Sequence, residues 1–288
     1  MAGWRHMWRA ALLAAGLLSV ASCAVSPVQD APNGADPVAL LSTCCDAVEK
    51  YPGFLVTLVE PKADRKPAIR TPHRLRPAYL SDKPEAVAYL MARLRPLDLL
   101  VTADKGLLTG RLVPGYFSHS LVYLGTEAQL RAAGLWHLPA LRAHHAAIRE
   151  GHVFYESRPP RVDFADPAKV LDVDSAAILR PDLAPGQAED ALRALLARHR
   201  VPFDSHLDSG TPDCLYCAEL LDVAMPFLEL PRQSGYGRET VVPDAIAAHA
   251  IRPDTPLRFI AFLHATPGGA ISAPATTLAA TIRRYWPG

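Results

Sequence analysis

Hydrophobic and polar positions repeat with helical spacing in several parts of the chain. Residues 84–95 carry apolar side chains at this spacing, and residues 185–199 do so behind a Pro–Gly start. Residues 217–228 predict a further helix, which Pro226 would stop or kink. A helix is also expected over about 38–50.

Short apolar runs, some with partial alternation, predict strands between these helices. They are residues 97–103, 119–125, 152–157, 170–181 and 258–263. A helical insertion, residues 126–151, separates the second run from the third and is split at Pro139. The residues after the last run predict a loose tail. Strands mixed with helices in this order favour an α+β domain.

The first 22 residues are typical of a secretory signal peptide, with Arg5 and Arg9 before an apolar run. That run, "AALLAAGLLSVA", is too short to cross a bilayer, which takes roughly 20 residues. Its end, "VASC", resembles the lipobox of bacterial lipoproteins, which implies cleavage before Cys23 and a lipid on that cysteine. By the same analogy, Ala24 favours the outer membrane. The alternative is an ordinary signal peptide with an incidental cysteine.

Charge excludes one broad class of partner. Residues 1–22 hold two arginines and no acid, so the mature charge is +1 − 2 = −1, which does not suit a general nucleic-acid binder. The stretch 61–77 carries six basic residues. They could bind a membrane surface or an anionic polymer, or they could simply belong to a solvated loop. The predicted organisation is a signal peptide (1–22), a lipidated cysteine and tether (23–37), an N-terminal helical extension (38–95), a main domain (96–265) and a C-terminal tail (266–288).

Two segments carry candidate chemistry. "SGTPDCLYCAELL" places Cys217 in the first turn of a predicted helix, where the positive end of the helix dipole lowers a thiol pKa. "HSLVYLG" places His119 at the start of a strand. A thiol hydrolase needs such a thiolate, a nearby imidazole and a group that orients the imidazole.

"SHSLVYLG", "HVFYES", "LRP" and "PFDSHLDSGTPDCLYCAEL" together resemble, in this order, the circularly permuted papain-like hydrolases related to NlpC (the YiiX/YebB-like group). In that group the histidine strand precedes the cysteine helix. "PLDLLVT" resembles the family's first strand, with Leu97 where a glycine is usual. The resemblance spans about residues 96–263 and implies a permuted papain-like fold, a small antiparallel sheet packed on helices. Phe203 and Asp204 match an aromatic–aspartate pair that we expect to be structural.

The resemblance assigns a role to each site residue. Cys217 would be the nucleophile and His119 the general base, while Glu156 would orient the histidine. Tyr216, through its backbone, and the Cys217 backbone N–H would shape an oxyanion site. The insertion at 126–151 separates His119 from Glu156 by more than is usual in the family.

The cysteines leave other interpretations open. Cys214 and Cys217 form a CxxC, and with Cys44 and Cys45 they could make two disulfides or a zinc site. We prefer a bridge between Cys214 and one of the adjacent pair, which leaves Cys217 free. His119 could likewise be a buried histidine that only caps a strand.

Two further patterns are weak. "LDSGTPD" contains the Asp-Ser-Gly of aspartic proteases but has no second copy, so a turn is the better interpretation. Four histidines in and beside the helical insertion are better explained as surface residues than as metal ligands: His137, His144, His145 and His152. We expect neither a metal nor a cofactor.

These observations predict a lipid-anchored cell-envelope cysteine hydrolase that cleaves an amide, with peptidoglycan peptides as the favoured substrate. Hydrolysis or transfer of lipid or acyl esters and amides, as elsewhere in the superfamily, is one alternative. The other is an inactive lipoprotein that binds cell-wall peptides or is purely structural. The expected partners are peptidoglycan or a small acylated substrate, and the membrane through the lipid anchor.

Overall fold

The computed structural model describes residues 31–32, 34–45, 74–210, 213–235 and 238–286. The expected signal peptide, Cys23, most of the tether and residues 61–73 of the basic stretch lie outside the described residues. No helix in the described part of the chain is long and apolar enough to span a membrane.

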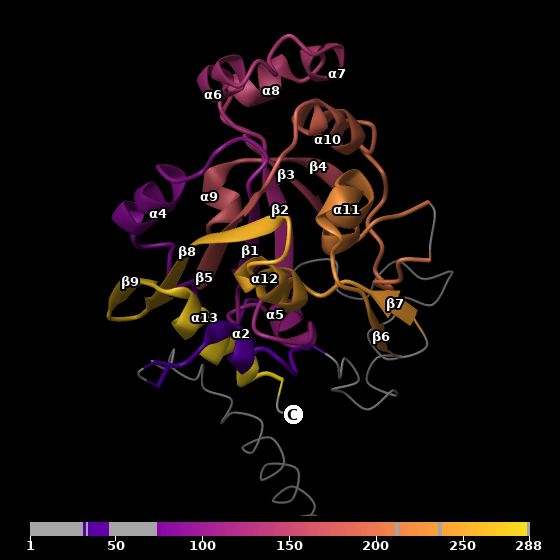
Figure 1. Ribbon diagram of the computed structural model, residues 1–288. Helices are drawn as coiled ribbons and strands as arrows, with labels where there is room; N and C mark the ends of the chain where they lie inside the picture. The colour runs from indigo at the N-terminus through magenta and orange to yellow at the C-terminus, as the bar shows by residue number, and fades with distance from the viewer. Residues whose placement is uncertain (1–30, 33, 46–73, 211–212, 236–237, 287–288) are drawn as a thin grey trace, which may run out of the picture.

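A seven-stranded antiparallel sheet forms the centre of the molecule (Figure 1). Its strands lie in the spatial order β4-β3-β2-β1-β5-β8-β9. They are β1 Leu99–Ala103, β2 His119–Tyr123, β3 Phe154–Arg158, β4 Arg161–Ala165, β5 Ser175–Pro181, β8 Leu257–Thr266 and β9 Gly269–Ala273. The central strand β1 is buried along its whole length. Its nearly continuous apolar sequence follows from that position, because both of its faces are covered.

Four helices are packed close to the sheet or to one another. Two of them, α10 (Gln187–Leu196) and α11 (Cys217–Ala224), contact each other, and α11 packs on β2 and β3. Another, α12 (Pro243–Ile251), packs on β1, β5 and β8, and α13 (Ala275–Arg283) packs on β8. The mixed α+β class is therefore confirmed, and α11 lies directly over the strand that begins with His119.

The helical insertion is also confirmed. It contains α6 (Glu127–Ala132), α7 (Pro139–Arg142) and α8 (His145–Arg149), which lie together at the top of Figure 1. Pro139 is the first residue of α7, where its missing N–H costs no helical hydrogen bond. Because α7 contacts α10, the insertion rests on the same side of the molecule as the cysteine helix.

The remaining elements are short. They are α2 Pro37–Leu40, α4 Pro84–Met91, α5 Leu108–Leu112, α9 Pro167–Val170, the 3-10 turn η1 Pro226–Leu228, and the separate hairpin β6 Gln233–Gly235 with β7 Arg238–Thr240. Pro226 ends α11 as predicted, two residues after the last helical position.

The prediction of a loose C-terminal tail is wrong. Residues 269–283 form β9 and α13, and Leu278 and Ile282 of α13 are completely buried. The expected helix at 38–50 is also much shorter within the described residues, because α2 ends at Leu40. The C-terminal segment was missed because distant partners stabilise it: α13 packs on β8 and also contacts α2.

Two members of the basic stretch have structural partners and do not form a free patch. Arg74 pairs with Asp104 and Asp172, at 2.9 Å each, and Arg76 pairs with Asp174 at 2.7 Å. These contacts attach the start of the segment 74–210 to the loops that follow β1 and precede β5.

The preferred disulfide is wrong as well. Cys44 and Cys45 are bonded to each other, and Cys214 and Cys217 are both free. This arrangement also excludes a four-thiolate zinc site and a domain closed by two disulfides.

Candidate active site

A buried carboxylate fixes the loop that leads to His119, the first residue of β2. The backbone N–H groups of Tyr116 and Phe117 each donate to Asp244 at 2.7 Å. Gly115 has a φ of +98°, and a Cβ there would meet the Asp244 Oδ2 atom at 2.4 Å. Only glycine lets the Asp244 carboxylate come this close to the backbone at position 115. Gly115 therefore makes room for the carboxylate that holds the histidine strand in place.

The segment before α11 is anchored to β3 and to the residues after α10. Leu215 donates its N–H to the Pro202 carbonyl and accepts from the Asp204 N–H, in a short bridge between two extended segments. Ser157 of β3 also donates its hydroxyl to the Leu215 carbonyl. The first turn of α11 is thereby tied to the strand that carries Glu156, and Cys217 at its first position is 9% exposed.

The structure brings the three expected residues into one series of polar contacts. The His119 Nε2 atom donates to the Glu156 Oε2 atom at 2.7 Å, and Glu156 is buried in β3. The Cys217 thiol lies close enough to this imidazole for each group to shift the pKa of the other. Since Nε2 is used by the carboxylate, Nδ1 is the nitrogen left for the thiol. The long insertion between His119 and Glu156 leaves both on adjacent strands, because it extends beyond the sheet as helices.

This series favours the charged forms of all three groups. Burial alone would lower the pKa of His119, but its hydrogen bonds to Cys217 and Glu156 raise that pKa to about 9. Burial alone would raise the pKa of Glu156, yet the hydrogen bond from His119 and the positive charges nearby lower it to about 2. Burial alone would also raise the pKa of the Cys217 thiol, and the contact with His119 lowers it. The shifts of Cys217 and His119 favour a thiolate beside an imidazolium.

Sequence reasoning missed Ser120, which lies against the thiol. The pairing of β2 with β3 covers Val122 and Tyr123 only, so the His119–Ser120 end of β2 is not paired with β3. The Ser120 backbone N–H and hydroxyl face Cys217 and lower its pKa further. The buried Ser120 hydroxyl makes no hydrogen bond with any described residue. The position of Ser120 directly after His119 is the one feature of the sequence that could have indicated its place in the site.

Tyr216 contributes to the site through its side chain, in a different way from that expected. Its hydroxyl accepts from the Val241 N–H at 2.7 Å and contacts Ser209 at 2.8 Å, which fixes the residue before the nucleophile. Its backbone N–H is directed at Glu219 of α11, 3.4 Å away, and is not free to bind an oxyanion. Within the described residues the Cys217 N–H has no acceptor, so it remains the candidate oxyanion donor.

Asp204 has the structural role expected of the aromatic–aspartate pair. The buried carboxylate accepts from the backbone N–H groups of His206 and Asp208, at 2.7 and 2.8 Å. It also lies beside Cys214, where burial and the negative charges of Asp204 and Glu219 raise the thiol pKa to about 11. The pKa values of the two CxxC thiols are thus shifted in opposite directions, and only the environment of Cys217 favours a nucleophilic thiolate.

Comparison with known protein families, curated proteins and solved structures gave no match.

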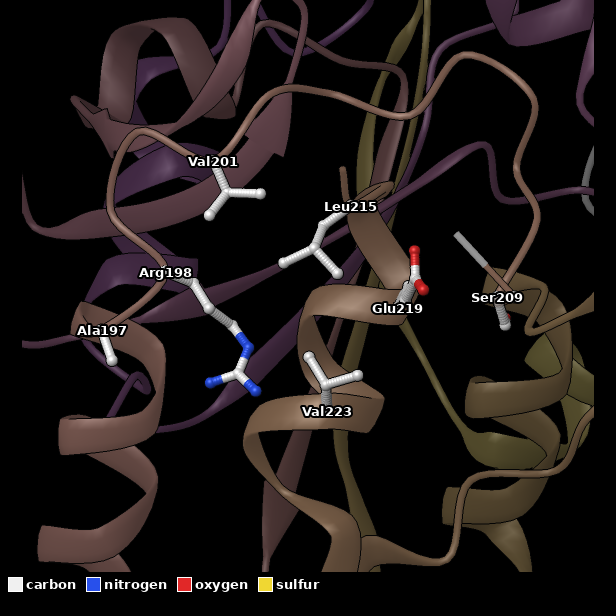
Figure 2. A pocket seen from close by; sticks show the side chains of 8 residues that line it. Ala197, Arg198, Val201, Ser209, Leu215, Glu219 and Val223 are labelled. Atoms are coloured by element: carbon white, nitrogen blue, oxygen red, sulfur yellow. The ribbon is translucent and has the colours of Figure 1, made fainter. Parts of the chain in front are cut away.

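A cavity beside α11 does not belong to the cysteine–histidine pair. It has a volume of about 450 Å³ and lies between the end of α10 and α11. Figure 2 shows Arg198, Leu215, Glu219 and Val223 around it. Cys217 and Glu219 are two positions apart on a helix and so point to opposite sides, Cys217 towards β2. Burial raises the pKa of the Glu219 carboxyl to about 7.

Two histidines of the insertion are placed by aromatic packing. His145 stacks on Trp136, and His144 packs against Phe164 and His199. No cluster of three or more histidine, cysteine or acidic side chains that could hold a metal ion exists in the part of the chain described. In the Asp-Ser-Gly stretch, Asp208 only closes a turn, accepting from the Gly210 N–H at 3.0 Å.

Proposed function

We propose that the protein is a cysteine hydrolase in which Cys217, His119 and Glu156 form the catalytic series. The observation that carries this proposal is the contact of a helix-start thiol with an imidazole whose other nitrogen donates to a buried carboxylate. A histidine strand that precedes a cysteine helix packed upon it also fits a permuted papain-like domain. The proposed substrate bond is an amide, with peptidoglycan peptides favoured, at a lipid anchor on Cys23 in the cell envelope.

Each group has a defined part in the reaction. The Cys217 thiolate attacks the carbonyl carbon, and the Cys217 N–H stabilises the oxyanion. The His119 imidazolium then gives its proton to the leaving amine, which yields a thioester on Cys217. Water attacks the thioester while His119 accepts a proton, and the acid leaves with the thiolate restored. Glu156 holds the imidazole in one orientation and stabilises its positive charge throughout.

The chain contains a matched pair of thiols for testing this proposal. The purified protein would be incubated with a panel of peptide thioesters, peptide amides and fatty-acyl esters, and adducts would be located by mass spectrometry. We expect an acyl adduct on Cys217 that Cys217→Ser abolishes and Cys214→Ser leaves in place. The panel separates amide cleavage from acyl-ester chemistry. A folded protein that forms no adduct with any compound would contradict the hydrolase and leave a peptide-binding or structural lipoprotein.

A further inference from the structure

The second cavity adjoins the catalytic carboxylate. Its volume is about 150 Å³, and it lies at the β3–β4 hairpin. Its lining includes Glu156 together with three basic side chains, Arg158, Arg161 and Lys169. Glu156 thus has His119 on one side and this cavity on the other, which connects the cavity with the proposed catalytic series.

Strand geometry places the charged groups of the hairpin on one face. Glu156 and Arg158 are two residues apart on β3, and Arg161 and Asp163 are two residues apart on β4. The register pairs Glu156 with Asp163 and Arg158 with Arg161. The four side chains therefore form a block of two acids and two arginines, and Lys169 reaches it from α9.

One cation of this block has hydrogen-bond donors that no described side chain uses. Arg161 pairs with Asp163 at 3.1 Å, and Lys169 pairs with Glu156 at 3.3 Å. Arg158 is half-buried, and its guanidinium makes no hydrogen bond or close ion pair with the described residues, although its charge helps to lower the pKa of Glu156. The N–H donors of this guanidinium are therefore free to bind a ligand, and the paired strands hold them at the cavity.

The shape and charge of the cavity suit a carboxylate. A guanidinium presents parallel N–H donors that match the two oxygens of a carboxylate. The cavity has room for a small planar anion, and its acids are already neutralised by Arg161, Lys169 and His119. A positively charged group would have to displace one of these existing pairs.

We propose that this cavity is a substrate subsite in which Arg158 binds a carboxylate. The inference rests on the proposed function, since it assumes that a substrate is attacked at Cys217. His119 and Glu156 lie between the thiol and the subsite, so the carboxylate belongs to a part of the substrate remote from the attacked carbonyl. The predicted substrates are acyl compounds with such a remote acid, for example peptides with an acidic side chain or a free C-terminus.

The test uses thiophenyl esters of linear dicarboxylic acids of increasing length, with the far end as a free carboxylate, a methyl ester or a primary amide. The rate of Cys217 acylation in the full-length protein is followed by mass spectrometry. At one length we expect the carboxylate to react ~10-fold faster than its methyl ester, the scale of one charge-assisted hydrogen bond. Arg158→Gln should bring this ratio to about 1, and Arg158→Lys should restore part of it.

The matched control is Arg193→Gln, at an exposed arginine of α10 that pairs with Asp190; its ratio should equal that of the unmodified protein. Equal rates for carboxylate and methyl ester at every length would overturn the subsite while leaving the hydrolase intact. So would a ratio that persists in a folded Arg158→Gln protein, with folding checked by its melting temperature. Failure of every ester to acylate Cys217 would instead overturn the proposed function, and the subsite with it.

Discussion

Replacing Glu156 by glutamine should remove the negative charge from the Cys217–His119–Glu156 series and leave the shape of the side chain nearly unchanged. Glutamine keeps the size of the side chain and an oxygen that can accept from the His119 Nε2 atom, now 2.7 Å from the carboxylate. It removes the negative charge that helps to raise the pKa of His119 to about 9. With that charge lost, the imidazolium is less stable, and the neutral thiol–imidazole pair gains population near neutral pH.

The size of the effect follows from the contact. A hydrogen bond to a charged group contributes about 1.5–3 kcal/mol, more than a neutral one. At 1.36 kcal/mol for each tenfold change, removal of the charge predicts a ~10- to 150-fold smaller thiolate population at pH 6. The difference should fade towards pH 10, where the thiol ionises without help from the imidazole.

The assay is the rate of Cys217 alkylation by iodoacetamide between pH 5 and pH 10, located by mass spectrometry. Glu127→Gln is the matched control, because that carboxylate also has a pKa lowered to about 2, by Arg149 and Arg131, on a helix far from the thiol. It should leave the profile unchanged. Superimposable profiles for Glu156→Gln and the unmodified protein would refute the ion-pair reasoning.

Three further results are expected. Ser120→Ala should slow Cys217 alkylation at pH 6 by ~2- to 13-fold, since one neutral hydrogen bond contributes about 0.5–1.5 kcal/mol; an unchanged rate would remove Ser120 from the site. The unmodified protein should melt at a higher temperature than Glu156→Gln, and this difference in melting temperature should be largest between about pH 4.5 and 6.5. The stabilisation from ionised Glu156 is complete above its ordinary pKa of 4.5 and is lost as pH falls through about 2. The stabilisation from protonated His119 is complete below its ordinary pKa of 6.5 and is lost as pH rises through about 9. A difference that stays constant from about pH 2 to pH 9 would contradict the linkage. Asp244→Asn should lower the free energy of unfolding by about 3 kcal/mol in urea titration, because three buried donors lose a charged acceptor; Trp286→Phe, which removes one of the three, should cost about 1.5 kcal/mol. Equal losses in the two variants would contradict this assignment.

Local pattern was enough to find the elements that carry the candidate site. The apolar run after His119 predicted β2, and the apolar face after Cys217 predicted α11 with its end at Pro226. Helical spacing also identified α10 and α4. These predictions succeeded because hydrophobic periodicity is set by neighbours along the chain, which the sequence displays directly.

What the sequence alone determined is therefore a set of elements, with a thiol at the start of one and an imidazole at the start of another. Only the tertiary structure decided that Ser120 faces the thiol, that Asp244 anchors the loop before His119, and that the last residues form β9 and α13. Strand order and buried hydrogen bonds join residues that are distant along the chain, and local periodicity carries no record of which partner each one meets.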